Sequence, residues 1–190
     1  MTPMDDDESY DERARPVRAA LPPSTTRGWD RIEYQRLWLY MASHRWRTLA
    51  IVPAEEGLST YEVASVIMGV GAHHGATIGV FDFRDVRLHR VLAVVADACE
   101  HVVPGERLIF ATRSIKENLA TIPLARAADG VLLCVSLGST RISLVEETIQ
   151  EIGKEHFLGS VLVRDPSAKA KAKARAPQPP WLRSRWEALW

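Results

Sequence analysis

Short apolar runs alternate with segments of helical periodicity between about residues 48 and 163 of this chain. The apolar runs have the length of buried β-strands, and they are Leu49–Val52, Thr77–Phe81, Leu108–Ala111, Val131–Val135 and Phe157–Val163. Strands that are apolar throughout, with helices between them, are typical of a parallel sheet that is covered on both faces. The pattern therefore predicts an α/β fold, a three-layer sandwich built on five strands with a mainly parallel sheet.

Helices are expected before the first strand and between the strands. The first should run from about Trp29 to Ser43, and a short one should begin with Pro123 at its first position and run to Ala128. The other helical stripes are Val63–Val70, Leu88–Cys99 and Val145–Ile152. The glycines around His73 and His74 indicate a frayed helix end rather than a metal site, since no Cys, Asp or Glu cluster accompanies the two histidines.

Composition changes at both ends of this predicted domain. Residues 1–28 are polar, lack periodicity and contain the acidic stretch 5–12, so we expect a disordered acidic tail. Residues 29–165 form the predicted domain, and residues 166–190 combine a basic linker with a Trp-rich amphipathic segment. Three of the six tryptophans fall within the last ten positions, and Leu182, Trp186, Leu189 and Trp190 share one helical face.

The overall composition is that of a globular protein. Of the 190 residues, 46% are apolar and 25% charged, and the formal net charge is zero. No apolar run approaches the roughly 20 residues that span a bilayer, and the acidic N-terminus does not read as a secretory signal. Cys99 and Cys134 lie in apolar patterns, where a thiol is usually a small buried hydrophobe. A cytoplasmic location is the resulting expectation.

The segment Ile51–Thr60 follows an apolar run and precedes a helix, as a phosphate-binding Walker A loop does. Such a loop needs glycines, a lysine for the outer phosphates and a Ser or Thr hydroxyl for Mg²⁺. The glycine and the hydroxyls remain here as Gly57, Ser59 and Thr60, but Leu58 occupies the lysine position and Glu55 and Glu56 precede the glycine. An ordinary helix start explains the same residues locally, because carboxylates and Ser or Thr favour helix N-termini.

Several segments occur in the order found in one family. Leu124–Val135 (LARAADGVLLCV), Glu33–Trp38 ahead of the loop, the EEGLST box and Leu158–Val163 together resemble the cytoplasmic domain of bacterial polysaccharide-biosynthesis tyrosine kinases. Those kinases are P-loop proteins related to the partition and division-site-placing ATPases. The resemblance covers about Glu33 to Val163, roughly two thirds of the chain, and implies a P-loop NTPase-like fold.

The same resemblance implies that the chemistry has been lost. The lysine position falls on Leu58, the Walker B aspartate on Ala111 and the base-reading asparagine near Val163, while Asp82 is the one surviving aspartate of a second acidic motif. No tyrosine follows Tyr61, although the kinases phosphorylate a C-terminal tyrosine cluster. We therefore expect no catalytic residue, no metal site and no cofactor beyond weak residual ATP and Mg²⁺ binding. The vestigial nucleotide site would comprise Gly57, Leu58, Ser59, Thr60 and Asp82.

The resulting hypothesis is a pseudokinase-like accessory protein of exopolysaccharide or capsule synthesis or export, peripheral to the inner membrane. Its expected partners are a polysaccharide co-polymerase or export membrane protein and related P-loop domains in an oligomer. The expected contact residues are Trp181, Leu182, Arg185, Trp186, Leu189 and Trp190. This segment could bind a groove on a partner, lie on an anionic membrane or fold back on its own sheet.

Two alternatives to this hypothesis remain open. One is an active ATPase or tyrosine kinase with a nonstandard loop, in which Asp82 holds the metal and another Arg or Lys replaces the missing lysine. The other is a partition-type positioning protein. The alternating Lys-Ala linker is a weak signal for nucleic acid, so a nucleic-acid partner is not expected.

Overall fold

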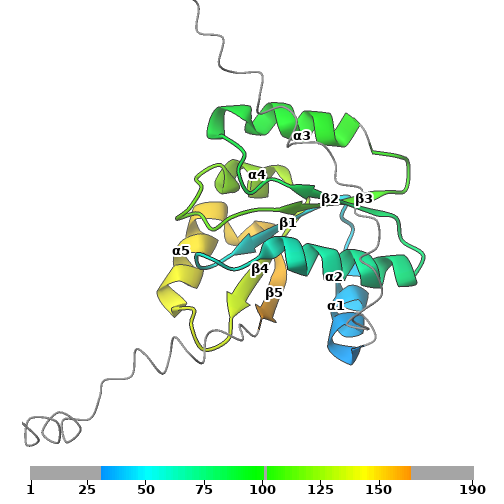
Figure 1. Cartoon of the computed structure of the whole chain (residues 1–190), viewed down its shortest axis with the longest axis horizontal. Helices are drawn as coiled ribbons and strands as arrows, with labels where there is room; N and C mark the ends of the chain where they lie inside the picture. Colours follow the sequence, from blue (N-terminus) through cyan, green and yellow to red (C-terminus); the bar gives the residue numbers. More distant parts are fainter. Residues whose placement is uncertain (1–30, 101, 164–190) are drawn as a thin grey trace, which may run out of the picture.

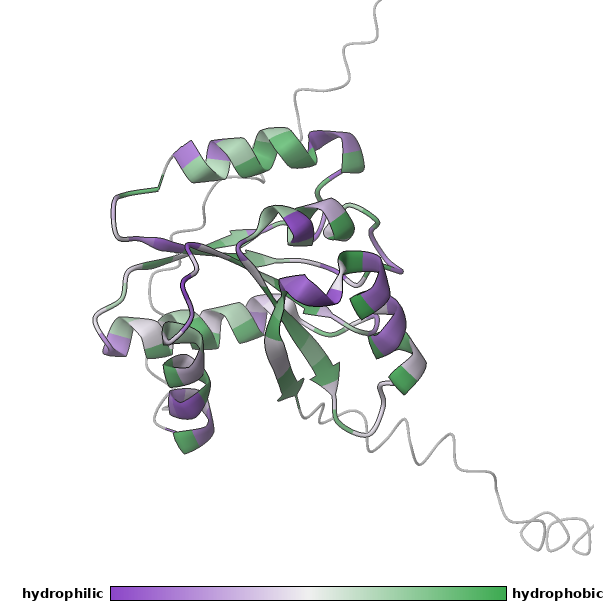
Figure 2. Ribbon diagram, turned by 180° about the vertical axis from the view of Figure 1, so that it is seen from behind, coloured by the Kyte–Doolittle hydropathy of each residue, from purple (hydrophilic) through white to green (hydrophobic). Residues whose placement is uncertain are grey.

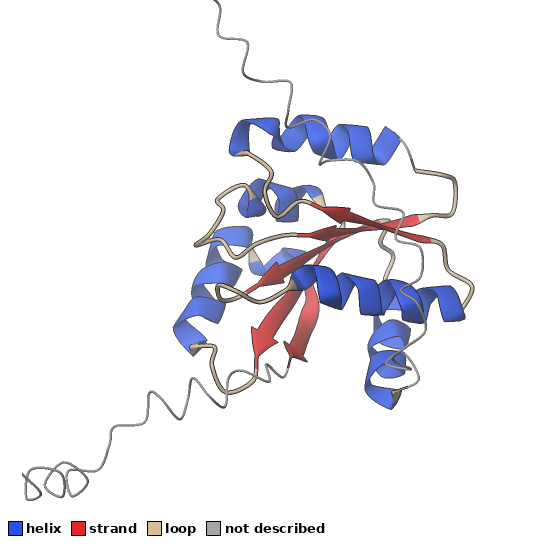
Figure 3. Cartoon of the chain, in the orientation of Figure 1, coloured by secondary structure: helices blue, strands red, loops and turns tan. Residues whose placement is uncertain are grey.

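A computed structural model describes residues 31–100 and 102–163 of the chain (Figure 1). The two predicted tails, including every tail residue expected to bind a partner, lie outside the described residues. The described part has the predicted architecture: Figure 3 shows a central sheet with helices on both sides.

The sheet contains five strands, and all four neighbouring pairs are parallel. The strands are β1 (Thr48–Pro53), β2 (Ile78–Asp82), β3 (Arg107–Ala111), β4 (Gly130–Ser136) and β5 (Phe157–Val163). They lie in the order β2-β3-β1-β4-β5, so β1 is the central strand and β2 and β5 form the two edges. Each predicted strand is present, with its ends shifted by one residue at most.

The helices divide unequally between the two faces of the sheet. The α-helices are α1 (Ile32–Ala42), α2 (Thr60–His73), α3 (Val91–Glu100), α4 (Thr121–Ala127) and α5 (Ile142–Ile152), with short 3₁₀ turns η2 (Leu88–Arg90) and η3 (Lys154–His156). Figure 1 shows α1 and α2 on one face and α3, α4 and α5 on the other.

Successive side chains of a strand point to opposite faces of the sheet, so the strands contribute to two separate cores. On β1, Leu49 and Ile51 join the core under α1 and α2, whereas Ala50 and Val52 join the core under α3, α4 and α5. All four are essentially inaccessible to solvent. Burial of β1 on both faces is the reason that its sequence is apolar without alternation.

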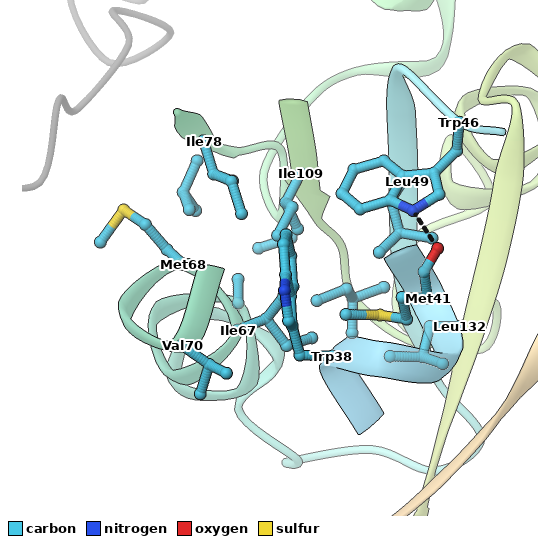
Figure 4. Close-up of a cluster of buried hydrophobic side chains, with 14 of the residues drawn as sticks. Trp38, Met41, Trp46, Leu49, Ile67, Met68, Val70, Ile78, Ile109 and Leu132 are labelled. Atoms are coloured by element: carbon cyan, nitrogen blue, oxygen red, sulfur yellow. Dashed lines mark hydrogen bonds between the residues drawn. The ribbon is translucent and has the colours of Figure 1, made fainter. Parts of the chain in front are cut away.

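The core under α1 and α2 is centred on two tryptophans. Figure 4 shows Trp38 of α1 packed among side chains of α2 and the sheet, and Trp46 beside Met41. The indole Nε1 of Trp46 donates a 2.9 Å hydrogen bond to the carbonyl oxygen of Met41. The polar atom of a buried indole is thereby satisfied, which such a position requires. This contact fixes the chain between α1 and β1.

Some helix boundaries differ from the sequence prediction. Helix α4 begins at Thr121 rather than Pro123. Proline is the third helical residue, and it is tolerated because amides in the first turn have no helical partner. Helix α1 is described from Ile32 to Ala42, within the predicted range, and Trp29 lies outside the described residues. The predicted helix end at the two histidines is confirmed, since α2 stops at His73 and Gly75 has φ +76°.

Candidate functional site

The connections leaving the sheet diverge beside β1. The chain passes from β1 to α2 on one face, whereas the chains leaving β3 and β4 pass to α4 and α5 on the opposite face. In open α/β sheets, ligands bind at such a switch point, outside the carboxyl ends of the strands. The loop after β1 is the segment predicted as a vestigial nucleotide site, so the topology places that segment where a ligand loop belongs.

The loop between β1 and α2 turns sharply at Gly57. Its start is fixed to the neighbouring strand, because the amide of Ala54 donates to the carbonyl oxygen of Cys134 at 2.9 Å. Gly57 has φ +78°, a conformation that other residues rarely adopt, and a Cβ placed there would meet nothing within 4 Å. Glycine is therefore favoured at position 57 by its backbone conformation and not by lack of space. The space beside it is open.

Leu58 lies at the position expected for the lysine. Its side chain is partly buried and packs against the core cluster under α1 and α2. Ser59 is the N-cap residue of α2, but its side chain makes no capping hydrogen bond. The loop therefore directs an aliphatic group into the protein and presents no cation of its own.

In a working loop the hydroxyl that contacts Mg²⁺ comes directly after the lysine, a position that Ser59 occupies here, and Thr60 is the next residue. Here it is fully buried, and its Oγ1 donates a 2.6 Å hydrogen bond to the carbonyl oxygen of Thr112, just beyond β3. Thr112 is equally buried, and its own Oγ1 donates to the carbonyl oxygen of Ile51 at 2.9 Å. These two bonds join the start of α2 to the ends of β3 and β1. The Thr60 hydroxyl has a structural partner.

The two loop glutamates have different surroundings. Glu55 is half-buried and accepts a 2.6 Å hydrogen bond from the hydroxyl of Ser139, in the turn between β4 and α5. Glu56 is exposed. Close by in the chain, the Oγ of Ser136 is buried without a hydrogen-bond partner among the described residues. The loop after β1 is thus bridged to the loop after β4 by a carboxylate, which disfavours a second anion there.

Asp82, at the end of β2, is held by Arg84. The guanidinium Nε and Nη2 donate to the two carboxylate oxygens at 2.8 and 2.6 Å, and the backbone amide of Arg84 donates at 3.2 Å. The same guanidinium lies 5.7 Å from the ring centroid of Tyr61. Burial alone would raise the pKa of Asp82, but the Arg84 hydrogen bonds and charge outweigh it and hold the pKa below its ordinary value. Asp82 is therefore an ionised carboxylate with an internal counter-ion.

The end of β3 lacks the carboxylate that a P-loop enzyme uses for metal. Ala111 occupies that position and is fully buried. The following turn is held by side chains: Glu117 accepts from both the amide and the hydroxyl of Ser114, and the Asn118 carboxamide donates to the carbonyl oxygens of Arg84 and Val86. Within residues 31–100 and 102–163, no group of three or more His, Cys, Asp or Glu is placed to hold a metal ion.

The structure brings the sequence-predicted site residues together only partly. Leu58, Ser59 and Thr60 follow Gly57 directly. Asp82 lies on the same side of the sheet, at the carboxyl end of another strand. In the charged segment after β2, Asp82 pairs with Arg84, and Asp85 pairs at 2.9 Å with Arg113, which follows β3.

One important residue escaped the sequence analysis. Asp129 lies at the opposite, amino-terminal edge of the sheet, and its Oδ2 accepts from the amides of Arg47 and Thr48 and from the Thr48 hydroxyl at 2.7–2.9 Å. The Asp129 amide in turn donates to the Thr48 hydroxyl at 2.9 Å. Burial would raise the pKa of Asp129, but these hydrogen bonds lower it overall. The Ala-Asp-Gly sequence at the start of β4 therefore has a structural reason: its aspartate joins the starts of β1 and β4.

A scan against protein-family models and a search of curated proteins found no match for this chain. The resemblance to polysaccharide-biosynthesis kinases accordingly stays a prediction, and so does the location of the protein. Among the residues that the structure describes, no helix is long and apolar enough to cross a membrane.

Proposed function

We propose that this protein is a non-catalytic, pseudokinase-like accessory factor of bacterial exopolysaccharide or capsule synthesis or export that acts by docking to an inner-membrane component. The observation that carries the first half of the proposal is the position of Leu58. An aliphatic side chain packed against the core stands where a phosphate-binding loop needs a lysine.

The neighbouring groups support the same conclusion. The Thr60 hydroxyl donates its hydrogen bond to the carbonyl oxygen of Thr112, and both oxygens of the Asp82 carboxylate accept from Arg84. Magnesium coordination through Asp82 would require breaking its hydrogen bonds with Arg84 first. A triphosphate over the loop would also lie close to Glu55 with no lysine to offset the repulsion. Each of these costs adds to the others.

The pathway and the partner rest on the resemblance of the sequence. It favours a polysaccharide co-polymerase or export membrane protein as the partner, and assembly with related P-loop domains. Contact of the domain with the partner would be reinforced by the segment Trp181–Trp190. Two modest contacts on one chain give a much tighter complex than either contact alone.

Calorimetric titration of the full chain with Mg²⁺-ATP tests the absence of nucleotide chemistry. We expect no saturable binding up to millimolar nucleotide. Micromolar binding that disappears in Gly57→Asp or Asp82→Ala would overturn the non-catalytic proposal and favour an ATPase with a nonstandard loop.

A pull-down from envelope extracts tests the docking role. The full chain, a chain ending at Asp165 and the variant Trp186→Ala are compared. We expect an inner-membrane polysaccharide protein with the full chain and clearly less of it with the other two. Equal recovery by all three would remove the tail from the proposal, and recovery of no envelope protein would remove the pathway.

A further inference from the structure

Three large apolar side chains are exposed where β4 and β5 end. Leu137 follows β4, Ile142 opens α5 and Leu162 is the penultimate residue of β5, with 49%, 76% and 64% of their surfaces exposed. The Leu137 amide donates to the carbonyl oxygen of Val163 at 2.8 Å, so the two strand ends are joined here. Figure 2 shows hydrophobic colouring at these strand ends and at the adjoining turn of α5. We call Leu137, Ile142 and Leu162 the β4–β5 patch.

In the part of the chain that the structure describes, the sheet edge next to this patch lacks the usual protection. β5 is an edge strand, and Phe157–Val163 contains no charged residue and no proline. Natural edge strands are generally blunted by such residues or covered by another segment. Tyr40 of α1 covers only the beginning of the strand, where its hydroxyl donates to the carbonyl oxygen of Leu158 at 2.6 Å. Among residues 31–100 and 102–163, the end of β5 at Leu162 and the patch beside it therefore remain exposed.

The surroundings of the patch are acidic. Residues 141–156 contain four glutamates, Glu146, Glu147, Glu151 and Glu155, against two cations, Arg141 and Lys154. One of the four, Glu147, pairs with Lys116, and the other three are exposed. Residues 166–190 have the opposite balance, with six cations against the single Glu187. The charges of α5 and of the C-terminal segment are complementary.

Chain length also favours an intramolecular contact. The chain leaves β5 at Val163, directly beside the patch, and 17 residues (164–180) connect it to residues 181–190. A flexible linker of that length has a root-mean-square span of roughly 20–25 Å, and here the docking surface lies next to its starting point. Short flexible linkers give effective concentrations of about millimolar, so even a weak apolar contact is populated.

We propose that the C-terminal segment, residues 181–190, docks on the β4–β5 patch of its own chain. The apolar residues that share one helical face in its sequence, Leu182, Trp186, Leu189 and Trp190, would cover the patch, and Arg183 and Arg185 would face the glutamates of α5. This inference is independent of the proposed function. Its consequence for that function is that a partner reaches these tryptophans only when the C-terminal segment leaves the β4–β5 patch.

Fluorine NMR of the full chain labelled with 5-fluorotryptophan tests the proposal. The six signals are assigned by single Trp→Phe substitutions, one for each tryptophan of the chain. We expect the signals of Trp181, Trp186 and Trp190 to lie away from the position of a solvent-exposed tryptophan, and to be independent of protein concentration. The double variant Ile142→Ser/Leu162→Ser should return them to the solvent position, and high salt should do so in part.

Leu92→Ser is the matched control, because Leu92 of α3 is 79% exposed and lies on another part of the surface. It should move none of the three tail signals. The buried Trp38 and Trp46 should keep their signals in all variants, which shows that the domain remains folded. Tail signals at the solvent position in the unmodified chain would overturn the proposal. Tail signals that shift on dilution together with a dimer in sedimentation would also overturn it, in favour of a second copy.

Discussion

The hydroxyl of Thr60 donates a 2.6 Å hydrogen bond to the carbonyl oxygen of Thr112, across the buried junction of α2 and β3. Thr60→Val keeps the shape of the side chain but leaves this carbonyl without its donor. We expect a loss of about 1–3 kcal/mol in the free energy of unfolding, measured by urea denaturation. Thr60→Ser should retain most of the stability, and Ser59→Ala, at a cap without a side-chain hydrogen bond, should change it by less than about 0.5 kcal/mol. A neutral Thr60→Val would contradict the structural role of this hydroxyl.

Asp129 should make the protein sensitive to acid. The folded state lowers the pKa of its carboxyl, so its stabilising contribution is complete above the unfolded-state value of about 3.9 and is lost as the pH falls through the folded-state value. In urea denaturations between pH 7 and pH 2.5, Asp129→Asn should be less stable at neutral pH and should show a flatter decline below about pH 4. Parallel curves for the two proteins would show that other groups govern the acid response.

Gly71 permits the close contact between α2, α1 and the sheet. A Cβ added there would collide with the end of the Ile78 side chain and approach the Trp38 ring to 3.0 Å. Alanine normally stabilises a helix over glycine by about 0.5–1 kcal/mol, but overpacking costs about 1–3 kcal/mol. We therefore expect Gly71→Ala to lower the thermal midpoint. Ala72→Ser, on the exposed neighbour, is the control and should be nearly neutral. A raised thermal midpoint for Gly71→Ala would mean that the Ile78 and Trp38 side chains move aside at little cost in free energy.

Restoring the lysine alone should not restore nucleotide binding. In Leu58→Lys, Glu55 and the Asp82–Arg84 pair remain in place, so Mg²⁺-ATP should still fail to bind at micromolar concentration in calorimetry. The substitution should also cost about 1–2 kcal/mol, since it removes apolar packing at a partly buried position. Leu58→Met conserves the volume and serves as the matched control. Micromolar affinity in Leu58→Lys would identify the lysine as the only missing part.

The two cysteines should differ strongly in reactivity. Burial raises the pKa of the Cys134 thiol to about 12, whereas Cys99 is half-buried. At pH 8 the thiolate fraction of Cys134 is then roughly a thousandfold below that of an ordinary thiol. A thiol reagent should label one cysteine of the folded protein quickly and both after denaturation. Cys99→Ala should abolish the fast phase. Fast labelling of Cys134 in that variant would show that β4 opens locally.

The sequence was sufficient to predict the sheet. Residues such as Leu49–Val52 form uninterrupted apolar runs because β1 is buried on both faces, and this pattern is visible without a structure. The strand order was not predictable in the same way. It depends on which faces the helices cover, and therefore on tertiary packing between residues that are distant in sequence.

The candidate site was predictable in position but not in detail. The spacing around Gly57 located the loop, and the positive φ of that residue accounts for the glycine at this position. The partners of Thr60, Glu55 and Asn118 were hidden, because they come from the ends of other strands. Asp129 was missed since a single aspartate before a strand resembles any polar turn residue. Its role appears only when β1 and β4 are adjacent.

The central place of β1 has a consequence for how the chain reaches its native state. β1 is made early during synthesis, yet both of its hydrogen-bonding neighbours come later in the sequence, and β4 does not end until Ser136. Pairing of β1 with β3 and β4 therefore requires closure of long loops, which slows folding. Until the ribosome has released that length, an apolar strand is without partners, and the nascent chain is at its most vulnerable to aggregation.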